Sequence, residues 1–254
     1  MNLKPLFCRA GNKTLMADNI ISLMPKHSIY VEPFVGGGGV YFKKPPVELD
    51  VINDLDKVLY DGYKLVERVS TNPDKYKKTL DTIPKLSAFL KSKITTPEDR
   101  LTEIIVRHCN GFSGTFITCK SGKVWREANP YSKLEKITLY KKRMKNTIIL
   151  NQDWEKVIKE TDTEDTLFYL DPPYEGSGTI YKNSEMDYNN LADVLSKIKG
   201  KFLMSINDSR NIRKIFRNFN IQKVKLATFA PKNPTKKQGK IGTKKRIELI
   251  IKNY

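Results

Sequence analysis

Apolar residues along this chain gather in short continuous runs, separated by intervals that are long enough for a helix. Runs of this kind, without strict alternation of apolar and polar positions, are typical of strands covered by helices on both faces of a sheet. Seven segments have this character: residues 28–35, 47–54, 146–152, 166–171, 201–208, 221–229 and 246–254. Residues 189–200 and 211–219 show helical periodicity between strands. The alternation predicts an α/β fold with a doubly wound, mostly parallel sheet.

One connection is too long for a single crossover helix, because about ninety residues separate the second predicted strand from the third. The interval contains helical patterns at residues 57–69 and 97–112, followed by a basic, glycine-containing stretch at 119–133. We therefore predict a helical insertion at residues 56–145, carried by a main domain that consists of residues 1–55 and 146–254.

The net charge of the chain indicates the kind of partner that it binds. The chain has 46 Lys and Arg against 28 Asp and Glu, a formal net charge of +18. Nine basic residues and no acidic one lie between Lys223 and Ile247, and nine more lie between Lys120 and Lys145. Charge on this scale attracts polyanions, so we predict a nucleic-acid partner. A lysine-rich surface that only aids solubility is the alternative.

Several classes of protein are disfavoured. No apolar run approaches the eighteen or so residues that span a bilayer, and the N-terminal stretch lacks the apolar core of a signal peptide. The three cysteines form no CxxC pair, and only two histidines are present. We therefore expect a protein of a reducing, intracellular compartment (a bacterial cytoplasm or a virus-infected host cell) that is not secreted and has no metal site.

A glycine run, residues 36–39, directly follows the first predicted strand and precedes an expected helix. Such a turn lets the backbone approach a ligand at the carboxyl edge of the sheet. It is neither a GxGxxG motif, whose third glycine would fall on Tyr41, nor a P-loop. Asp54 ends the second strand, where a carboxylate can accept hydrogen bonds from ribose hydroxyls. The pair predicts an adenosine-containing ligand.

A second acid and a large ring, Asp153 and Trp154, follow the third predicted strand. Here Asp153 could accept a hydrogen bond from an adenine amino group, and Trp154 could stack on the base. The alternative is structural: Asp153 as a helix N-cap and Trp154 as a core residue.

The sequence Asp-Pro-Pro-Tyr, residues 171–174, follows the fourth predicted strand. Its two prolines fix φ twice and withhold two backbone donors, which gives a stiff loop. The exocyclic amine of a nucleic-acid base is a poor nucleophile, because its lone pair is conjugated with the ring. Asp171 and the carbonyl of Pro172 could accept the two amine hydrogens and stabilise the positive charge that develops on nitrogen. Tyr174 could stack on the base once it is flipped out. A proline-stiffened loop without chemistry is the alternative.

The motifs FVGGG and DPPY, in this order, resemble those of the D12 class, or Dam-like, DNA adenine-N6 methyltransferases. The resemblance implies a Rossmann-like, seven-stranded, mostly parallel sheet with a reversed last strand and a helical target-recognition insertion between the second and third strands. It implies S-adenosylmethionine as the methyl donor, no metal, and in-line transfer to N6 of a flipped adenine in double-stranded DNA. Residues 9–13, RAGNK, are similar to the family's W-A-G-G-K segment, with Lys13 preserved and Arg9 and Asn12 different.

The resemblance also implies roles for individual residues. It places Asp171, Pro172 and Tyr174 in catalysis. It places these residues at the cofactor: Arg9, Lys13, Phe34, Gly36, Gly38, Asp54, Asp153, Trp154 and Asp171.

Contacts with DNA are expected from the insertion, whose residues 110–116 resemble the family's N-G-x-x-G segment, and from the basic loop before the last strand. The candidates are Asn110, Lys120, Lys123, Arg126, Asn129, Tyr131, Tyr181, Lys237 and Lys244. Two alternatives stay open: an RNA adenine methyltransferase, and a catalytically silent nucleic-acid-binding homologue. The recognition sequence, an associated restriction endonuclease and the oligomeric state are not determined by the sequence.

Overall fold

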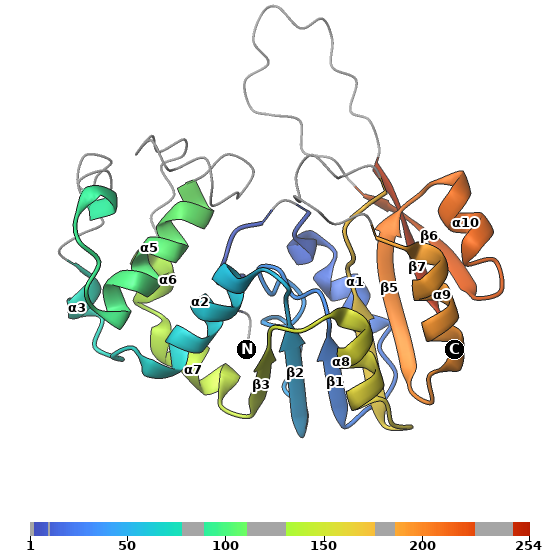
Figure 1. The fold of residues 1–254 in the computed structure, drawn as a ribbon, viewed down its shortest axis with the longest axis horizontal. Helices are drawn as coiled ribbons and strands as arrows, with labels where there is room; N and C mark the ends of the chain where they lie inside the picture. Colours follow the sequence, from blue (N-terminus) through green and yellow to red (C-terminus); the bar gives the residue numbers. More distant parts are fainter. Residues whose placement is uncertain (1–2, 10, 78–88, 111–130, 176–185, 227–245) are drawn as a thin grey trace, which may run out of the picture. The chain divides into compact units, whose positions relative to one another are not determined.

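A computed structural model describes residues 3–9, 11–77, 89–110, 131–175, 186–226 and 246–254 (Figure 1). The chain divides into two compact units, Met1–Thr161 and Asp162–Tyr254, which are described in turn.

The first unit is built on three parallel strands: β1 (Ile29–Glu32), β2 (Leu49–Asn53) and β3 (Thr147–Leu150), with β2 in the middle. Val31 of β1 and Ile52 of β2 are almost completely buried. Because all three strands run the same way, their carboxyl ends lie at one edge. The segments that follow them, around residues 33–39, 54–56 and 151–154, therefore come together there.

The helices of the first unit are η1 (Lys13–Leu15), α1 (Ala17–Ser22), α2 (Lys57–Arg68), α3 (Asp74–Lys77), α5 (Pro97–Asn110), α6 (Tyr131–Leu134), α7 (Ile137–Met144) and α8 (Trp154–Thr161). In Figure 1, α3, α5, α6 and α7 lie beyond β3, to one side of the three strands. The helices predicted at 57–69 and 97–112 are thus confirmed as α2 and α5. They pack closely, since a Cβ at Gly62 would lie 3.3 Å from Ile104 Cγ2.

The second unit contains β4 (Thr166–Leu170), β5 (Lys201–Asn207), β6 (Asn220–Leu226) and β7 (Arg246–Lys252). Strands β4 and β5 are parallel, whereas β7 runs antiparallel to both β5 and β6. Two helices accompany them, α9 (Tyr188–Lys197) and α10 (Arg210–Ile215). The seven described strands belong to one mostly parallel sheet with a reversed last strand, which confirms the predicted fold class.

The prediction of a helix directly after the glycine run is wrong. Residues 40–44 form turns, with hydrogen bonds from Phe42 N to Gly38 O (3.0 Å) and from Lys44 N to Val40 O (2.9 Å). The helix does not propagate because Pro45 and Pro46 follow. A proline disfavours the helical conformation of the residue before it and supplies no donor for the next turn.

A buried ion cluster lies beside β2 in the first unit. Asp50 Oδ1 pairs with Lys44 Nζ at 2.7 Å, and Asp50 Oδ2 pairs with Arg143 Nη1 at 2.7 Å. Arg143 also donates to the Tyr41 carbonyl (2.9 Å), which links α7 to the chain after the glycine run.

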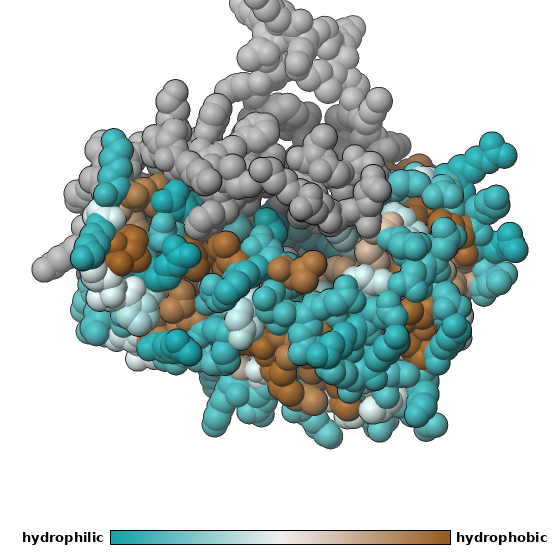
Figure 2. Space-filling view, in the orientation of Figure 1, coloured by the Kyte–Doolittle hydropathy of each residue, from teal (hydrophilic) through white to brown (hydrophobic). Residues whose placement is uncertain are grey.

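The outer surface is different in character: the described residues on the face in Figure 2 are mainly hydrophilic.

Candidate active site

Asn53, the last residue of β2, ties together the carboxyl ends of all three strands in the first unit. Its Nδ2 donates to the carbonyls of Pro33 (2.9 Å) and Gln152 (3.0 Å), and its Oδ1 accepts from Gln152 N (2.9 Å). The side chain is buried, so these bonds are needed to satisfy its polar atoms. Sequence reasoning did not single out Asn53; the available signal was a polar residue that ends an apolar strand immediately before Asp54.

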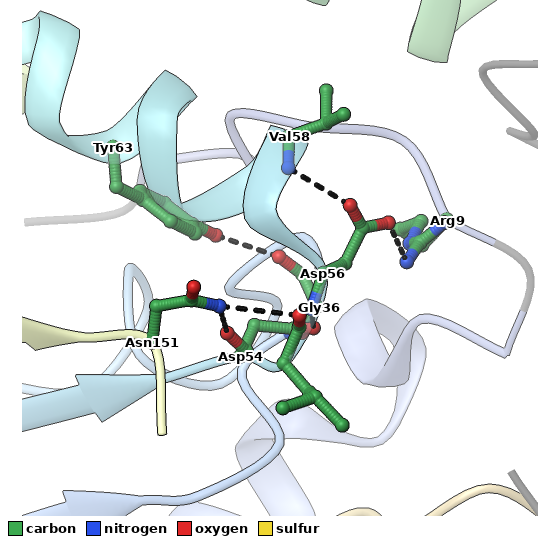
Figure 3. Close-up of polar contacts among 8 residues, drawn as sticks. Arg9, Gly36, Asp54, Asp56, Val58, Tyr63 and Asn151 are labelled. Carbon is green, nitrogen blue, oxygen red and sulfur yellow. Dashed lines mark hydrogen bonds and ion pairs between the residues drawn. The ribbon is translucent and has the colours of Figure 1, made fainter. Parts of the chain in front are cut away.

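Asp54 is bonded to the glycine turn. Its Oδ2 accepts from Gly36 N at 2.9 Å, and its Oδ1 accepts from Asp56 N at 2.9 Å (Figure 3). Burial raises the pKa of Asp54 above its ordinary 3.8, whereas the bond from Asp56 N and the nearby Arg9 guanidinium oppose that rise. Each carboxylate oxygen has a second lone pair, so Asp54 can still accept from a ligand hydroxyl.

The glycine turn itself requires glycine at two positions. Gly36 has φ 51° and Gly38 has φ 75°, a region that other residues rarely adopt. The Gly36 carbonyl accepts from the Tyr63 hydroxyl of α2 at 2.8 Å, as Figure 3 shows. Apart from Gly36 and its two chain neighbours, no atom of the described residues lies within 4 Å of the place where a Cβ of Gly36 would be. The turn is therefore held on its α2 side and open beside Gly36.

Asn12, one of the two departures in the RAGNK segment, packs on the same turn. A Cβ at Gly39 would lie 2.1 Å from Asn12 Oδ1, and a Cβ at Gly37 would lie 2.9 Å from Asn12 Nδ2. Asn12 Oδ1 also caps η1, because it accepts from Thr14 N at 3.0 Å. The asparagine thus fills the space left by two glycines that lack side chains.

Arg9, the other departure, forms an ion pair with Asp56: Nη2 lies 2.6 Å from Asp56 Oδ2. Asp56 Oδ1 accepts from Val58 N (2.9 Å) and so caps α2. Figure 3 shows the resulting chain of contacts, from Arg9 through Asp56 and Asp54 to Gly36. Three of the predicted cofactor residues are therefore connected in one network.

Four further predicted cofactor residues lie in the same unit. Phe34 and Trp154 bring their rings to 6.3 Å between centroids, with 32° between the ring planes. Asp153 Oδ1 accepts from Glu155 N (2.9 Å) at the start of α8. This is the helix-capping role that the sequence analysis gave as the alternative for Asp153. Trp154 is half-buried rather than a full core residue. Lys13 is buried, and its Nζ donates to Gly11 O at 3.0 Å.

The DPPY tetrapeptide of the second unit directly follows the fully buried strand β4. Asp171 and Tyr174 are half-buried, and Pro172 is buried. The Tyr174 hydroxyl donates to Glu248 Oε1 of β7 at 2.8 Å. The carbonyl of Pro173 accepts from the Tyr188 hydroxyl of α9. Two other elements thus hold the loop.

The next residue, Glu175, anchors the loop to the start of α10. Its Oε2 accepts from Ser209 Oγ at 2.6 Å, and its Oε1 accepts from Asn211 Nδ2 at 2.7 Å. These bonds lower the pKa of Glu175 below its ordinary value. Neither Glu175 nor Glu248 was identified from the sequence, because nothing local marks an acid whose partner lies thirty or more residues away.

Most of the residues predicted to contact DNA lie outside the residues that the structure describes. Asn110 is the last residue of α5 and Tyr131 the first of α6, with side chains that are not described. The others lie outside the described residues: Lys120, Lys123, Arg126, Asn129, Tyr181, Lys237 and Lys244.

The described part of the chain has neither a metal-binding cluster nor a helix that could span a membrane. It contains no group of three His, Cys, Asp or Glu side chains that could hold a metal ion. None of its helices is long and apolar enough to cross a bilayer. Cys8 and Cys109 are not joined by a disulfide, and their sulfur atoms lie 3.1 Å apart.

Comparison with known families matches residues 10–228 to the D12 class N6 adenine-specific DNA methyltransferases. The chain belongs to this family. The match contains both the Gly36–Asp54 network and the DPPY loop, so the protein is a site-specific DNA methyltransferase that acts on adenine N6.

Individual relatives are similar along almost their whole length. The Type II methyltransferase M1.LlaDCHI of Lactococcus lactis subsp. cremoris is 25% identical; the match covers 100% of this chain and 96% of that protein. The Type II methyltransferase M.MjaIII of Methanocaldococcus jannaschii is 28% identical, with 100% of both chains covered. A DNA adenine methylase of Haemophilus influenzae is 24% identical over 92% of this chain and 90% of its own.

Proposed function

We propose that the DPPY loop performs the chemistry of this methyltransferase, with Asp171 and the carbonyl of Pro172 accepting the two hydrogens of the adenine amine. These acceptors stabilise positive charge that develops on N6 as the new carbon–nitrogen bond forms. Tyr174 stacks on the flipped base. The observation that carries the proposal is the fixation of the loop: β7 holds the Tyr174 hydroxyl and α9 holds the Pro173 carbonyl. Acceptors that are already in place lose little entropy when the amine arrives.

S-adenosylmethionine is the donor in this proposal, and the first unit holds it. Bound there, it supplies a methyl group activated by a sulfonium. Asp54 accepts from the ribose hydroxyls, and the open side of Gly36 lets the backbone approach the ligand. Phe34 and Trp154 contact the adenine ring, whereas Asp153 has one oxygen engaged as a helix cap and offers the other. The tied Asp54 carboxylate, the positive φ of Gly36 and the two neighbouring rings all suit this ligand.

Arg9 and Lys13 have different tasks in the same half of the site. Arg9 acts through Asp56, since its ion pair steadies the residue whose N–H binds Asp54. Lys13 lies in the N-terminal segment and is buried. Its ammonium group can attract the carboxylate of the donor. Gly38 allows the turn to pass Phe42 and Tyr63, because a Cβ there would lie 2.7 Å from the Phe42 ring.

Double-stranded DNA is the substrate, and we assign its contacts to the insertion, residues 56–145, and to the basic loop before β7. The +18 charge supports the assignment, because each phosphate contact releases counterions from the duplex. Two relatives are named Type II methyltransferases, so the proposal includes a restriction endonuclease of the same site specificity as a companion.

The test is transfer of labelled methyl groups to unmethylated duplex DNA, with RNA in parallel and nucleosides separated by mass. We expect label in N6-methyladenine of DNA. Asp171→Ala should lower turnover by roughly a hundredfold or more and leave salt-sensitive DNA binding intact. Asp165→Ala is the matched control: it removes an exposed carboxylate at the other end of β4 and should leave turnover unchanged.

Three results would contradict the proposal. Near-normal turnover of Asp171→Ala would exclude its catalytic role. Label in RNA alone would favour the RNA methyltransferase. DNA binding without transfer by the unaltered protein would favour the silent homologue.

A further inference from the structure

Glu248 is an acid in a place where the sheet calls for an apolar side chain. It belongs to β7, whose sequence is Arg-Ile-Glu-Leu-Ile-Ile-Lys, and only 2% of it is exposed. In the register of the sheet it lies between Asn207 of β5 and Val224 of β6. Burial of a carboxylate is costly unless hydrogen bonds compensate for the lost water. A purely structural strand would be served better by leucine or valine.

The bond that Glu248 makes is directed at the DPPY loop. Its Oε1 accepts from the Tyr174 hydroxyl at 2.8 Å, across 74 residues of sequence. Tyr174 is half-buried, so the ring keeps accessible surface while its tip is fixed. A tyrosine ring has two rotatable bonds, and a hydrogen bond at its far end restricts both. Charged acceptors make such bonds stronger than neutral ones.

Resting on the assignment of Tyr174 as the stacking residue, we propose that Glu248 is its positioning residue: it holds the ring in the orientation that receives the flipped adenine. Glu248 does not touch the base. Its contribution is pre-organisation, because the ring does not have to be ordered when the base arrives.

The proposal is tested by substitutions at Glu248 in the full-length enzyme. Glu248→Gln keeps an oxygen acceptor and should retain turnover within about threefold. Glu248→Ala removes it and should lower kcat by roughly tenfold, the upper end of what one hydrogen bond is worth. The dissociation constant for S-adenosylmethionine should stay within twofold, because all the residues that we place at the cofactor, except Asp171, belong to the other unit.

Stacking is measured separately with 2-aminopurine at the target adenine, once sequencing of methylated DNA has defined the site. Stacking on tyrosine quenches this base, so the complex of Glu248→Ala should be brighter than those of the unaltered enzyme and Glu248→Gln. Ser205→Ala is the matched control, since it removes the partner of another buried tyrosine in the same unit (Tyr169, 2.8 Å). It should lower the melting temperature without changing 2-aminopurine fluorescence.

A double-mutant cycle with Tyr174→Ala separates the two proposals. Near-normal turnover of Tyr174→Ala would remove the stacking role and the proposed function with it. If Tyr174→Ala is impaired but Glu248→Ala is not, only the positioning role is wrong. If Glu248→Ala lowers turnover as much in the Tyr174→Ala background as alone, Glu248 acts through general stability and the inference is overturned. We expect no further loss in that background.

Discussion

Replacing Gly39 with alanine inserts a methyl group into space that Asn12 already fills. The new Cβ would lie 2.1 Å from Asn12 Oδ1 and 3.1 Å from Asn12 Cγ. A carbon and an oxygen do not approach so closely, so the Asn12 side chain must leave and its bonds to Thr14 N (3.0 Å) and Thr14 Oγ1 (2.6 Å) are lost. Overpacking costs about 1–3 kcal/mol and loss of a cap about 1 kcal/mol.

The clash depends on one side chain, so a second substitution should relieve it. Asn12→Gly restores the glycine of the W-A-G-G-K pattern and by itself should cost only a few tenths of a kcal/mol. In that background Gly39→Ala should cost about 1 kcal/mol, because Thr14 N remains 3.2 Å from the new Cβ. The expected coupling is about 1–3 kcal/mol. Gly37→Ala is the control: its Cβ would lie 2.9 Å from Asn12 Nδ2, but its main clash is with the backbone carbonyl of Phe7 at 2.1 Å, which Asn12→Gly cannot move.

The assay is thermal unfolding of the single and double variants, with S-adenosylmethionine titrated into each. One kcal/mol shifts the melting temperature by roughly 2–4 °C for a chain of about this size. We expect a drop of about 4–16 °C for Gly39→Ala alone, reduced to about 2–4 °C beside Asn12→Gly. Equal drops in both backgrounds, or a rescue of Gly37→Ala by Asn12→Gly, would refute the reasoning.

Arg143→Ala breaks a buried ion pair with Asp50 and should lower the free energy of unfolding by about 3–5 kcal/mol in urea titrations. Lys197→Ala removes an exposed pair and should change it by under about 0.5 kcal/mol; equal effects would contradict the role of burial. Asn53→Ala leaves the half-buried backbone N–H of Gln152 unpaired and should cost about 1–3 kcal/mol by the same titration, whereas an unchanged midpoint would show that water replaces the bond. Affinity for S-adenosylmethionine should fall on acidification at a higher pH than an ordinary aspartate would cause, because burial raises the pKa of Asp54 above 3.8 and its carboxylate is the binding form. Binding calorimetry across pH should show that this loss of affinity at low pH disappears in Asp54→Asn. If the loss persists in that variant, a group other than Asp54 is responsible for it.

The sequence predicted the order of strands and helices well, because buried strands and amphipathic helices leave periodic patterns in their own residues. It failed after Gly39, where apolar residues suggested a helix and two prolines stopped it. At Asp153 the sequence left both a ligand contact and a helix cap open, and the structure shows the cap, with Glu155 N donating to Asp153 Oδ1.

Local pattern by itself marked the segments to which we assign the chemistry: a glycine turn after one strand, an acid after the next, and a stiff DPPY loop after the fourth. Tertiary structure decided what holds these pieces. Arg9 lies 47 residues from Asp56, and Tyr174 lies 74 residues from Glu248. A side-chain bond across such distances depends on how strands and helices are placed in space. No window of neighbouring residues carries that information, so Arg9 was noticed only as a departure from a pattern and Glu248 was not noticed at all.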